Sequence, residues 1–469
     1  QATLENLPAI RVSRWQVEAG RGRLEEAQGR FDWTVGALAG YSDQRQDVPP
    51  AADQVAGDSL GDLGVTDYKA SVTKEFRSGI SVGPEVEWTH TRYRTTDADP
   101  TDRASLKLTV TIPLLQGRGR TAAAADEAAA EFEWQANRLD LRHTIATSIR
   151  QAAAAYWECR LAQEQRVIQR ESETAADLLL QRMRKMSEAD QTAPADLNQV
   201  VANLADRQAA SFEAEQRLVA ARVALVLAMG SASDAIVSLP PAAAPFPAAA
   251  PDLLSNLPRS PDLVALAVRR RDDLKSSRLR EEAALALQRA ARVNANPQVD
   301  LVLGGGYVQD DGPPYEAETE TYVADAMLRY VQPLPNHAGR GRLRQADAAY
   351  QKALLQTQDL QRTLGANVAS ALSALQLSAQ AVEKARDAVV SYEKAVASEE
   401  QKLKMGLGTV LDVMTMTDRL RSARLAEVAG RQGYAASLVN LRFETGTLVS
   451  GQDEQVEVSE KDVLTTPSP

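Results

Sequence analysis

The chain has 469 residues, a formal net charge of −10 and only 5% aromatic residues, and alanine supplies much of its apolar content. The acidic charge disfavours a nucleic-acid partner, and a single cysteine, Cys159, excludes a framework of intrachain disulfides. No apolar run approaches the roughly eighteen residues of a membrane helix, which excludes a helical membrane protein but leaves a β-barrel open. No signal peptide begins the chain, and since a processed chain would look the same, its compartment stays open.

The first part of the chain predicts a helix followed by a group of strands. Residues 1–30 fit a helix, and residues 31–115 then change to the alternating patterns that are typical of strands. The polar stretch 42–66 is rich in Pro, Gly and Asp, which predicts a loop. Four segments within this region are candidate strands: 32–41, 68–77, 80–94 and 104–114.

A long helical hairpin is predicted next. Residues 118–188 contain no proline and no glycine beyond Gly119, which predicts one helix of about 100 Å at 1.5 Å per residue. The stretch SEADQTAP, 187–194, is a break, and Pro194 suits the first turn of the following helix. That second helix is expected to end at Gly230.

The same order of elements then returns. Gly230 follows Asp196 by 34 positions and Gly446 follows Asp412 by the same 34, and this match indicates an internal duplication. The last residues are acidic and then rich in Thr and Pro, which predicts disorder. The chain therefore divides into repeat 1 at 1–230, with strands in 31–115 and a helical hairpin at 118–230; a Pro/Ala-rich linker at 231–260; repeat 2 at 261–446, with a first helix, strands in 297–335 and a hairpin at 339–446; and a tail at 447–469.

A strand-to-helix corner appears once in each repeat. IPLLQGRGRTAAAA, 112–125, passes from an alternating strand through Pro to G-R-G-R and an Ala-rich helix, and VQPLPNHAGRGRLRQA, 331–346, does the same. The pattern predicts the same turn twice. Its arginines could bind an anion, but solvated arginines at a corner are the favoured interpretation. The corner residues are Gly117, Arg118, Gly119 and Arg120, and Gly339, Arg340, Gly341 and Arg342.

The long helix of repeat 2 carries a heptad seam. Spacings of four and three residues alternate throughout it, which predicts a left-handed supercoil against neighbouring helices. The hairpin could pack on itself, or lateral neighbours could come from other subunits, because long helices with thin seams do not form a globule. The seam residues are Leu364, Val368, Ala371, Leu375, Ser378, Val382, Ala385, Val389, Tyr392, Val396, Glu399 and Leu403.

The strands predict a sheet with one apolar and one polar face. Half of the 22 aromatic residues lie in 31–115 and 297–335, which suits a membrane barrel. A soluble antiparallel sheet with one solvated face alternates in the same way, so the strands alone leave both open. The charged residues predicted on the polar face are Glu85, Glu87, Lys107, Asp325 and Arg329.

Catalytic and metal-binding patterns are missing from the sequence. None of the three histidines, at 90, 143 and 337, has a second candidate ligand at metal spacing. Cys159 fits a packed small residue better than a nucleophile. Gly304–Gly306 is followed by a polar turn rather than a helix, which disfavours a phosphate-binding loop. No enzyme, cofactor or metal site is therefore predicted.

These features resemble the TolC-like outer-membrane efflux proteins over nearly the whole chain. The resemblance rests on the duplicated helix–strand–strand–helix unit, the G-R-G-R corners, NLPAI near the start and RRRDDLKSSRLREEAA at 269–284, where Asp272 replaces the family's usual proline. MGLGTVLDVMTMTDRLRSARL, 405–425, is similar to the family's turn before its final helix. The resemblance implies a mainly α chain with a membrane β-barrel portion, which assembles as a homotrimer into one β-barrel in the outer membrane and an α-barrel in the periplasm.

The resemblance also implies the function of a passive exit duct. It would serve a tripartite efflux or type I secretion system, with a periplasmic adaptor (membrane fusion protein), an inner-membrane RND or ABC transporter and outer-membrane lipid as partners. The polar face would line the lumen, and the G-R-G-R corners would join barrel to helices. A non-enzymatic helical coiled-coil scaffold or adaptor with a soluble β-domain is the alternative.

The two helix-hairpin ends carry the gate and adaptor positions that the resemblance implies. Asp412 matches the family's acidic ring at the pore, although a helix cap is its ordinary alternative, and Thr415 stands at a second acidic position. Gly408 stands where some members have an arginine. Family members usually give two strands per repeat, so 68–94 is either an added hairpin or an enlargement of the barrel. The adaptor-contacting residues would be Met405, Gly406, Leu407, Gly408, Thr409, Val410 and Leu411 at one tip, and Ser187, Glu188, Asp190 and Thr192 at the other.

Overall fold

The computed structural model consists of two compact units, and each unit combines parts of both repeats. Unit 1 contains Gln1–Val17, Ala136–Ser276 and Thr357–Pro469, and unit 2 contains Glu18–Gln135 and Ser277–Gln356. Within these bounds the structure describes residues 2–45, 62–93, 99–188, 194–231, 240–249, 259–312, 318–451, 458 and 465–466.

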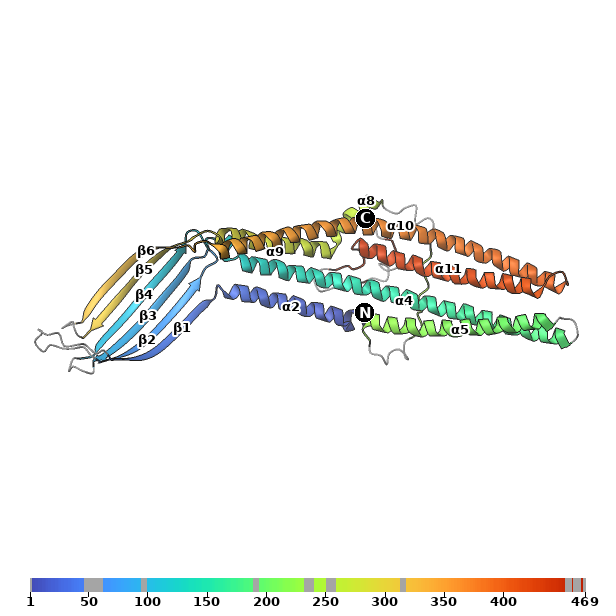
Figure 1. Cartoon of the computed structure of the whole chain (residues 1–469), viewed down its shortest axis with the longest axis horizontal. Coiled ribbons are helices and arrows are strands. Elements are labelled where there is room, and N and C mark those ends of the chain that lie inside the picture. The colour runs from blue at the N-terminus through green and yellow to red at the C-terminus, as the bar shows by residue number, and fades with distance from the viewer. Residues whose placement is uncertain are drawn as a thin grey trace, which may run out of the picture. The chain divides into compact units, whose positions relative to one another are not determined.

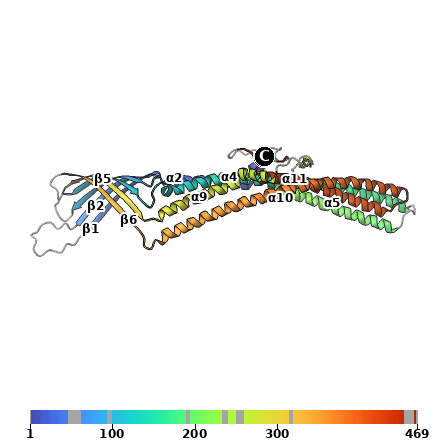
Figure 2. The same cartoon turned by 90° about the horizontal axis from the view of Figure 1, so that it is seen from above.

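The two predicted helical hairpins are present. The first consists of α4 (Ala125–Glu188) and α5 (Pro194–Met229), and the second of α10 (His337–Lys404) and α11 (Val410–Glu444). In unit 1, α10 and α11 lie side by side in both views (Figures 1 and 2). Pro194 opens α5, where its missing N–H costs nothing.

Three of the predicted helices are divided or shortened at their ends. The helix over 1–30 breaks into α1 (Ala2–Asn6) and α2 (Pro8–Gly29). The first helix of repeat 2 breaks at Arg271, whose extended backbone separates α8 (Ser260–Arg270) from α9 (Asp272–Asn294). A short α3 (Arg120–Ala123) precedes α4.

Unit 2 contains one six-stranded antiparallel sheet in which the strands follow chain order (Figure 1). All four candidate strands of repeat 1 join the two strands of repeat 2, so the segment 68–94 belongs to this sheet. The strands are β1 (Trp33–Arg45), β2 (Asp62–Glu75), β3 (Ser81–Tyr93), β4 (Thr101–Pro113), β5 (Gln298–Asp311) and β6 (Thr319–Val331).

The prediction of a loop over 42–66 is wrong at both ends of this range. β1 continues to Arg45 and β2 begins at Asp62, and these two residues are paired in the antiparallel ladder. Tertiary pairing therefore extends the strands into polar sequence, because each ladder step satisfies backbone groups regardless of side-chain type.

The two G-R-G-R corners differ, which corrects the prediction of one turn used twice. Gly117 and Gly119 adopt φ values of 77° and 75°, which favour glycine, and form a true turn before α3. Gly339–Arg342 instead already lies inside α10, which begins at His337. Asn336 opens that helix, since its side-chain oxygen accepts a hydrogen bond from the Gly339 N–H at 3.0 Å.

The predicted heptad seam is confirmed as the buried side of α10 within unit 1. Every one of its twelve residues is buried or half-buried. Val368, Ala371 and Leu375 pack with Tyr434 and Leu438 of α11 in one core cluster. Cys159 is buried in a second cluster between α4 and α5, consistent with its interpretation as a packing residue.

The described part of the linker is packed against unit 1. Residues 240–249 form neither helix nor strand, and the ring of Phe246 lies 5.5 Å from that of Trp157 on α4. Arg160 donates to the Ala242 carbonyl at 2.8 Å, and the Tyr156 hydroxyl accepts from the Ala244 N–H at 2.9 Å. In the tail, Arg442 binds Thr465 and Thr466, so these tail residues have fixed partners.

Candidate functional site

The sheet of unit 2 separates apolar from polar side chains by strand register. Ala37, Ala70, Val86, Leu106 and Tyr307 are successive partners across β1 to β5, so they share one face. The alternation predicted for β1 and β4 is therefore continuous across the sheet. Most large apolar side chains on this face are exposed, including Val35, Val86, Leu106, Leu108 and Leu328.

Aromatic residues lie in two groups on the apolar face. Trp33 at the start of β1 and Tyr330 near the end of β6 are close to the helix-bearing end of the strands. Tyr41 is eight residues beyond Trp33, about 26 Å further along the strand at 3.3 Å per residue. On the neighbouring strands the second group contains Tyr68 and Trp88, whose rings stack with their centroids 5.5 Å apart, and Tyr307 and Tyr322. Aromatic residues that flank apolar side chains along a strand are typical of strands that cross a bilayer.

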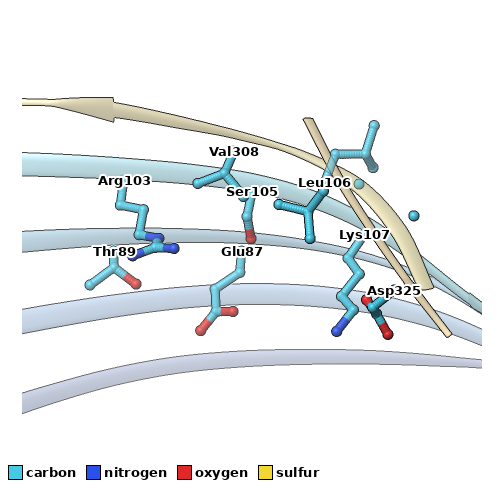
Figure 3. A pocket seen from close by; sticks show the side chains of 11 residues that line it. Glu87, Thr89, Arg103, Ser105, Leu106, Lys107, Val308 and Asp325 are labelled. Atoms are coloured by element: carbon cyan, nitrogen blue, oxygen red, sulfur yellow. The ribbon is translucent and has the colours of Figure 1, made fainter. Parts of the chain in front are cut away.

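All five predicted charged residues lie together on the opposite, polar face. Glu85 is paired with Lys107, Gly304 with Asp325 and Asp300 with Arg329, and these rows alternate with the apolar rows. This face has a hollow of about 440 Å³, and Glu87, Lys107 and Asp325 are among the side chains that line it (Figure 3). The charges are mixed: Lys69 pairs with Glu85 at 2.7 Å, and Arg329 with Asp300 at 2.7 Å.

The two outer strands of the sheet each have one open edge. β1 pairs with β2 and β6 pairs with β5, and the sheet order ends at both. β6 is exposed along almost its whole length, with Tyr322 at 81%. Since all neighbours are antiparallel, β1 and β6 run in opposite directions, so β6 of one copy could pair with β1 of another. Long open edges in apolar strands require such a partner.

The second hairpin tip holds the predicted gate and adaptor residues. Thr409 and Asp412 form a capping box: Asp412 donates its N–H to the Thr409 hydroxyl oxygen, and its carboxylate accepts from the Thr409 N–H and hydroxyl. These bonds to Thr409 hold the pKa of Asp412 below its usual range. The Thr415 hydroxyl donates to the Leu411 carbonyl at 2.8 Å. Asp412 is therefore a helix cap in the single chain, and its role in a pore stays a prediction.

The two tips approach each other inside unit 1. Val410 and Met414 of α11 pack on Leu180, Met183 and Val200 of the first hairpin, so Val410 is directed inward. Met405, Leu407 and Leu411 are instead exposed, with Leu407 at 76%. At the first tip the structure describes Ser187 and Glu188, whereas Asp190 and Thr192 lie outside the described residues.

α5 carries an apolar stripe that no element of the described chain covers. Val201, Phe212, Val219 and Leu227 are exposed, and Phe212 reaches 70%. Their spacings of 11, 7 and 8 residues keep them near one side of the helix. A helix with an exposed apolar stripe requires a lateral neighbour, so this stripe favours the interpretation that other subunits supply one.

Sequence reasoning missed a buried ionic cluster at the break between α8 and α9. Arg271 donates to both carboxylate oxygens of Asp273, at 2.9 and 2.7 Å, and to Glu444 at 3.0 Å. Its guanidinium also lies 4.6 Å from the centre of the Phe443 ring. Asp272, at the position of the expected proline, pairs with Arg142 at 3.0 Å. The only signal was the run RRRDDL, whose partners Arg142 and Glu444 are 130 and 173 residues away along the chain.

Among the described residues, no helix is long and apolar enough to cross a membrane. No group of three or more His, Cys, Asp or Glu residues in the described ranges could hold a metal ion.

A family profile and several solved structures match most of the chain. The profile of the family described as "Outer membrane efflux protein" matches residues 1–231 and 263–447. No curated protein sequence matches. Among solved structures, a membrane protein from Pseudomonas aeruginosa aligns with a TM-score of 0.68 at 17% identity, covering 95% of this chain and 92% of its own.

Two further solved structures carry informative descriptions. The CmeC outer membrane channel of Campylobacter jejuni aligns with a TM-score of 0.68 at 14% identity, covering 99% of this chain and 88% of its own. The outer membrane protein VceC of Vibrio cholerae aligns with a TM-score of 0.66 at 16% identity, covering 95% and 94%. The chain thus has the fold of these outer-membrane proteins, in which the helices form an α-barrel and the strands a β-barrel.

Proposed function

Since the chain belongs to the outer membrane efflux protein family and is located in the outer membrane, we propose that three copies form a passive exit duct through that membrane. The observation that carries this proposal is the two-faced sheet with two open edges. Its apolar face would contact lipid, its polar face would line the lumen, and closure would pair β6 of each copy with β1 of the next. Closure is required because every backbone group in lipid needs a partner.

The helices support the same assembly. The exposed stripe on α5 and the long thin seam of α10 leave lateral surface for neighbouring copies. In the trimer the helices would continue the barrel as a tunnel into the periplasm. The G-R-G-R corners would lie where strands become helices, with Arg118, Arg120, Arg340 and Arg342 exposed near the lipid headgroups.

The hairpin tips are the proposed docking site of a periplasmic adaptor. Met405, Leu407 and Leu411 form an exposed apolar group at the turn between α10 and α11. An inner-membrane RND or ABC transporter would supply the energy, and the duct itself would perform no chemistry. Asp412 and Thr415 are the proposed gate residues at the narrow end.

Purification tests the duct against the alternative of a soluble scaffold. The protein should require detergent for extraction and migrate with a mass of three chains of 50.7 kDa each, plus detergent. It should then form ion-conducting pores in a planar bilayer. A monomer that is soluble without detergent would contradict the proposal.

The adaptor contact needs a separate test. Leu407→Asp should abolish adaptor-dependent export in cells while leaving the amount of trimer unchanged, because Leu407 has no packing role in the chain. Val219→Asp, on the α5 stripe, is the matched control and should instead reduce the trimer. Unchanged export with Leu407→Asp would place the adaptor elsewhere.

A further inference from the structure

The β2–β3 hairpin occupies the middle of the sheet of unit 2. β1 pairs with β2 over thirteen residue pairs, from Trp33–Lys74 to Arg45–Asp62, and β3 pairs with β4 over eleven. β1 and β4, which would be neighbours in a chain with two strands per repeat, have the hairpin between them. Moving the hairpin out of the sheet would break both ladders.

The hairpin has the same dimensions and faces as the other strands. β2 has 14 residues and β3 has 13, which exceeds the 9–11 residues that cross a bilayer at about 45°. Tyr68 and Trp88 extend the apolar face, and Lys69, Glu85 and Glu87 extend the polar face. An added hairpin in solvent would have no reason to continue this alternation in register.

The turn of the hairpin is fixed to the strand-to-helix corner. The Gly119 N–H donates to the Ser78 carbonyl at 2.9 Å, and Arg77 forms two 2.7 Å hydrogen bonds with Glu127 of α4. Gly79 lies so close to the Gly117 carbonyl that a Cβ would be 2.3 Å from its oxygen. The hairpin therefore ends at the same level as the other strands.

We propose that the β2–β3 hairpin crosses the membrane as part of the barrel, so that three copies close a barrel of eighteen strands, three times six. This inference rests on the trimeric duct proposed above. At a strand spacing of about 4.8 Å and a tilt of about 40°, eighteen strands give a backbone diameter of about 36 Å, against about 24 Å for twelve. The outer exit therefore suits bulky solutes, with a cross-section about 2.2-fold larger than that of a twelve-stranded barrel.

Cysteine labelling in proteoliposomes tests whether the hairpin spans the membrane. In a Cys159→Ala background, Glu87→Cys on the polar face of β3 should react with a water-soluble maleimide, and Val86→Cys on the apolar face should not. The matched controls are Ser105→Cys and Leu106→Cys on β4, which belongs to the barrel with or without the hairpin. On β4 we likewise expect Ser105→Cys to react with the maleimide and Leu106→Cys not to react.

Each outcome of the labelling decides between the two proposals. Alternation on both strands supports the larger barrel. If only the polar-face cysteine of β4 reacts but both cysteines of β3 react, the larger barrel is wrong and the proposed duct is unaffected. Reaction at both positions of β4 would overturn the duct as well. Images of the detergent-solubilised trimer along its axis give the strand count, and a ring of about 24 Å instead of about 36 Å would overturn the enlargement.

Discussion

Replacing Arg271 with alanine should destabilise unit 1 strongly. The guanidinium is only 8% exposed and is the shared partner of Asp273 and Glu444, whose side chains are 16% and 10% exposed. Its removal leaves two carboxylates close together without their cation. Breaking a buried ion pair from one side costs about 3–5 kcal/mol, and we expect a loss of this size in the free energy of unfolding.

Two further variants separate charge burial from lost packing. Arg271→Met combined with Glu444→Gln removes an uncompensated charge and should recover part of the loss. Arg362→Ala breaks an ion pair with Asp359 on the exposed side of α10, where the arginine side chain is 80% exposed, and should cost less than about 1 kcal/mol. The assay is denaturant unfolding of the detergent-solubilised protein, followed by helical circular dichroism.

The pH dependence gives an independent signature of the same cluster. Burial opposes ionisation of Asp273, but its bonds to Arg271 outweigh burial and hold the pKa of this carboxyl below its usual range. A depressed folded-state pKa contributes stability above the unfolded value near 4, and this stability is lost as pH falls through the folded pKa. Arg271→Ala should therefore move the acid loss of stability to higher pH. Equal stability losses for Arg271→Ala and Arg362→Ala, with no shift of the acid transition, would refute the reasoning.

Three other predictions concern packing, the gate and topology. Ala371→Leu should destabilise the protein by about 1–3 kcal/mol through overpacking, because Ala371 is 3% exposed in the seam, and an unchanged melting profile would mean that the seam is misplaced. Asp412→Asn keeps a cap acceptor but removes the charge, so it should change the cation selectivity of bilayer pores, whereas Thr409→Ala should lower only the melting temperature; the reverse pattern would make Asp412 a cap alone. The strand ends away from the helices should face outward, so Asp99→Cys should react with an impermeant thiol reagent on intact cells, and no reaction of protein known to be present would invert the topology.

Local periodicity was sufficient to predict the helices and strands and which side of each is apolar. The 4-3 spacing from Leu364 to Leu403 identified the buried side of α10, and alternation in β1 and β4 identified the face that Trp33 and Leu106 share. These predictions held because a helix or strand repeats its geometry within a few residues, so side-chain type alone fixes which side is apolar. The hairpins followed from the same short-range patterns, whereas the duplication and the family resemblance followed from motifs that recur along the chain.

Periodicity was not sufficient to predict where the helices and strands end or which conformation the two G-R-G-R sequences adopt. The two G-R-G-R sequences look alike, yet one is a turn with positive φ and the other lies inside α10, because Asn336 caps the helix three residues earlier. The polar ends of β1 and β2 become strand because each offers the other a complete ladder. The strand ends are decided by backbone pairing, which leaves no mark in side-chain composition, whereas the helix start is decided by one side chain, Asn336, that periodicity does not register.

The sequence by itself determined a duplicated helix–strand–strand–helix chain with a two-faced set of strands and a seam for neighbouring helices. Only the tertiary structure decided that β2 and β3 lie between β1 and β4 and that Arg271 joins Asp273 to Glu444. The physical reason is the distance along the chain between the interacting groups. Strand order and the pairing of buried charges depend on groups far apart in the chain, and side-chain periodicity carries no information about which of several compatible partners is chosen.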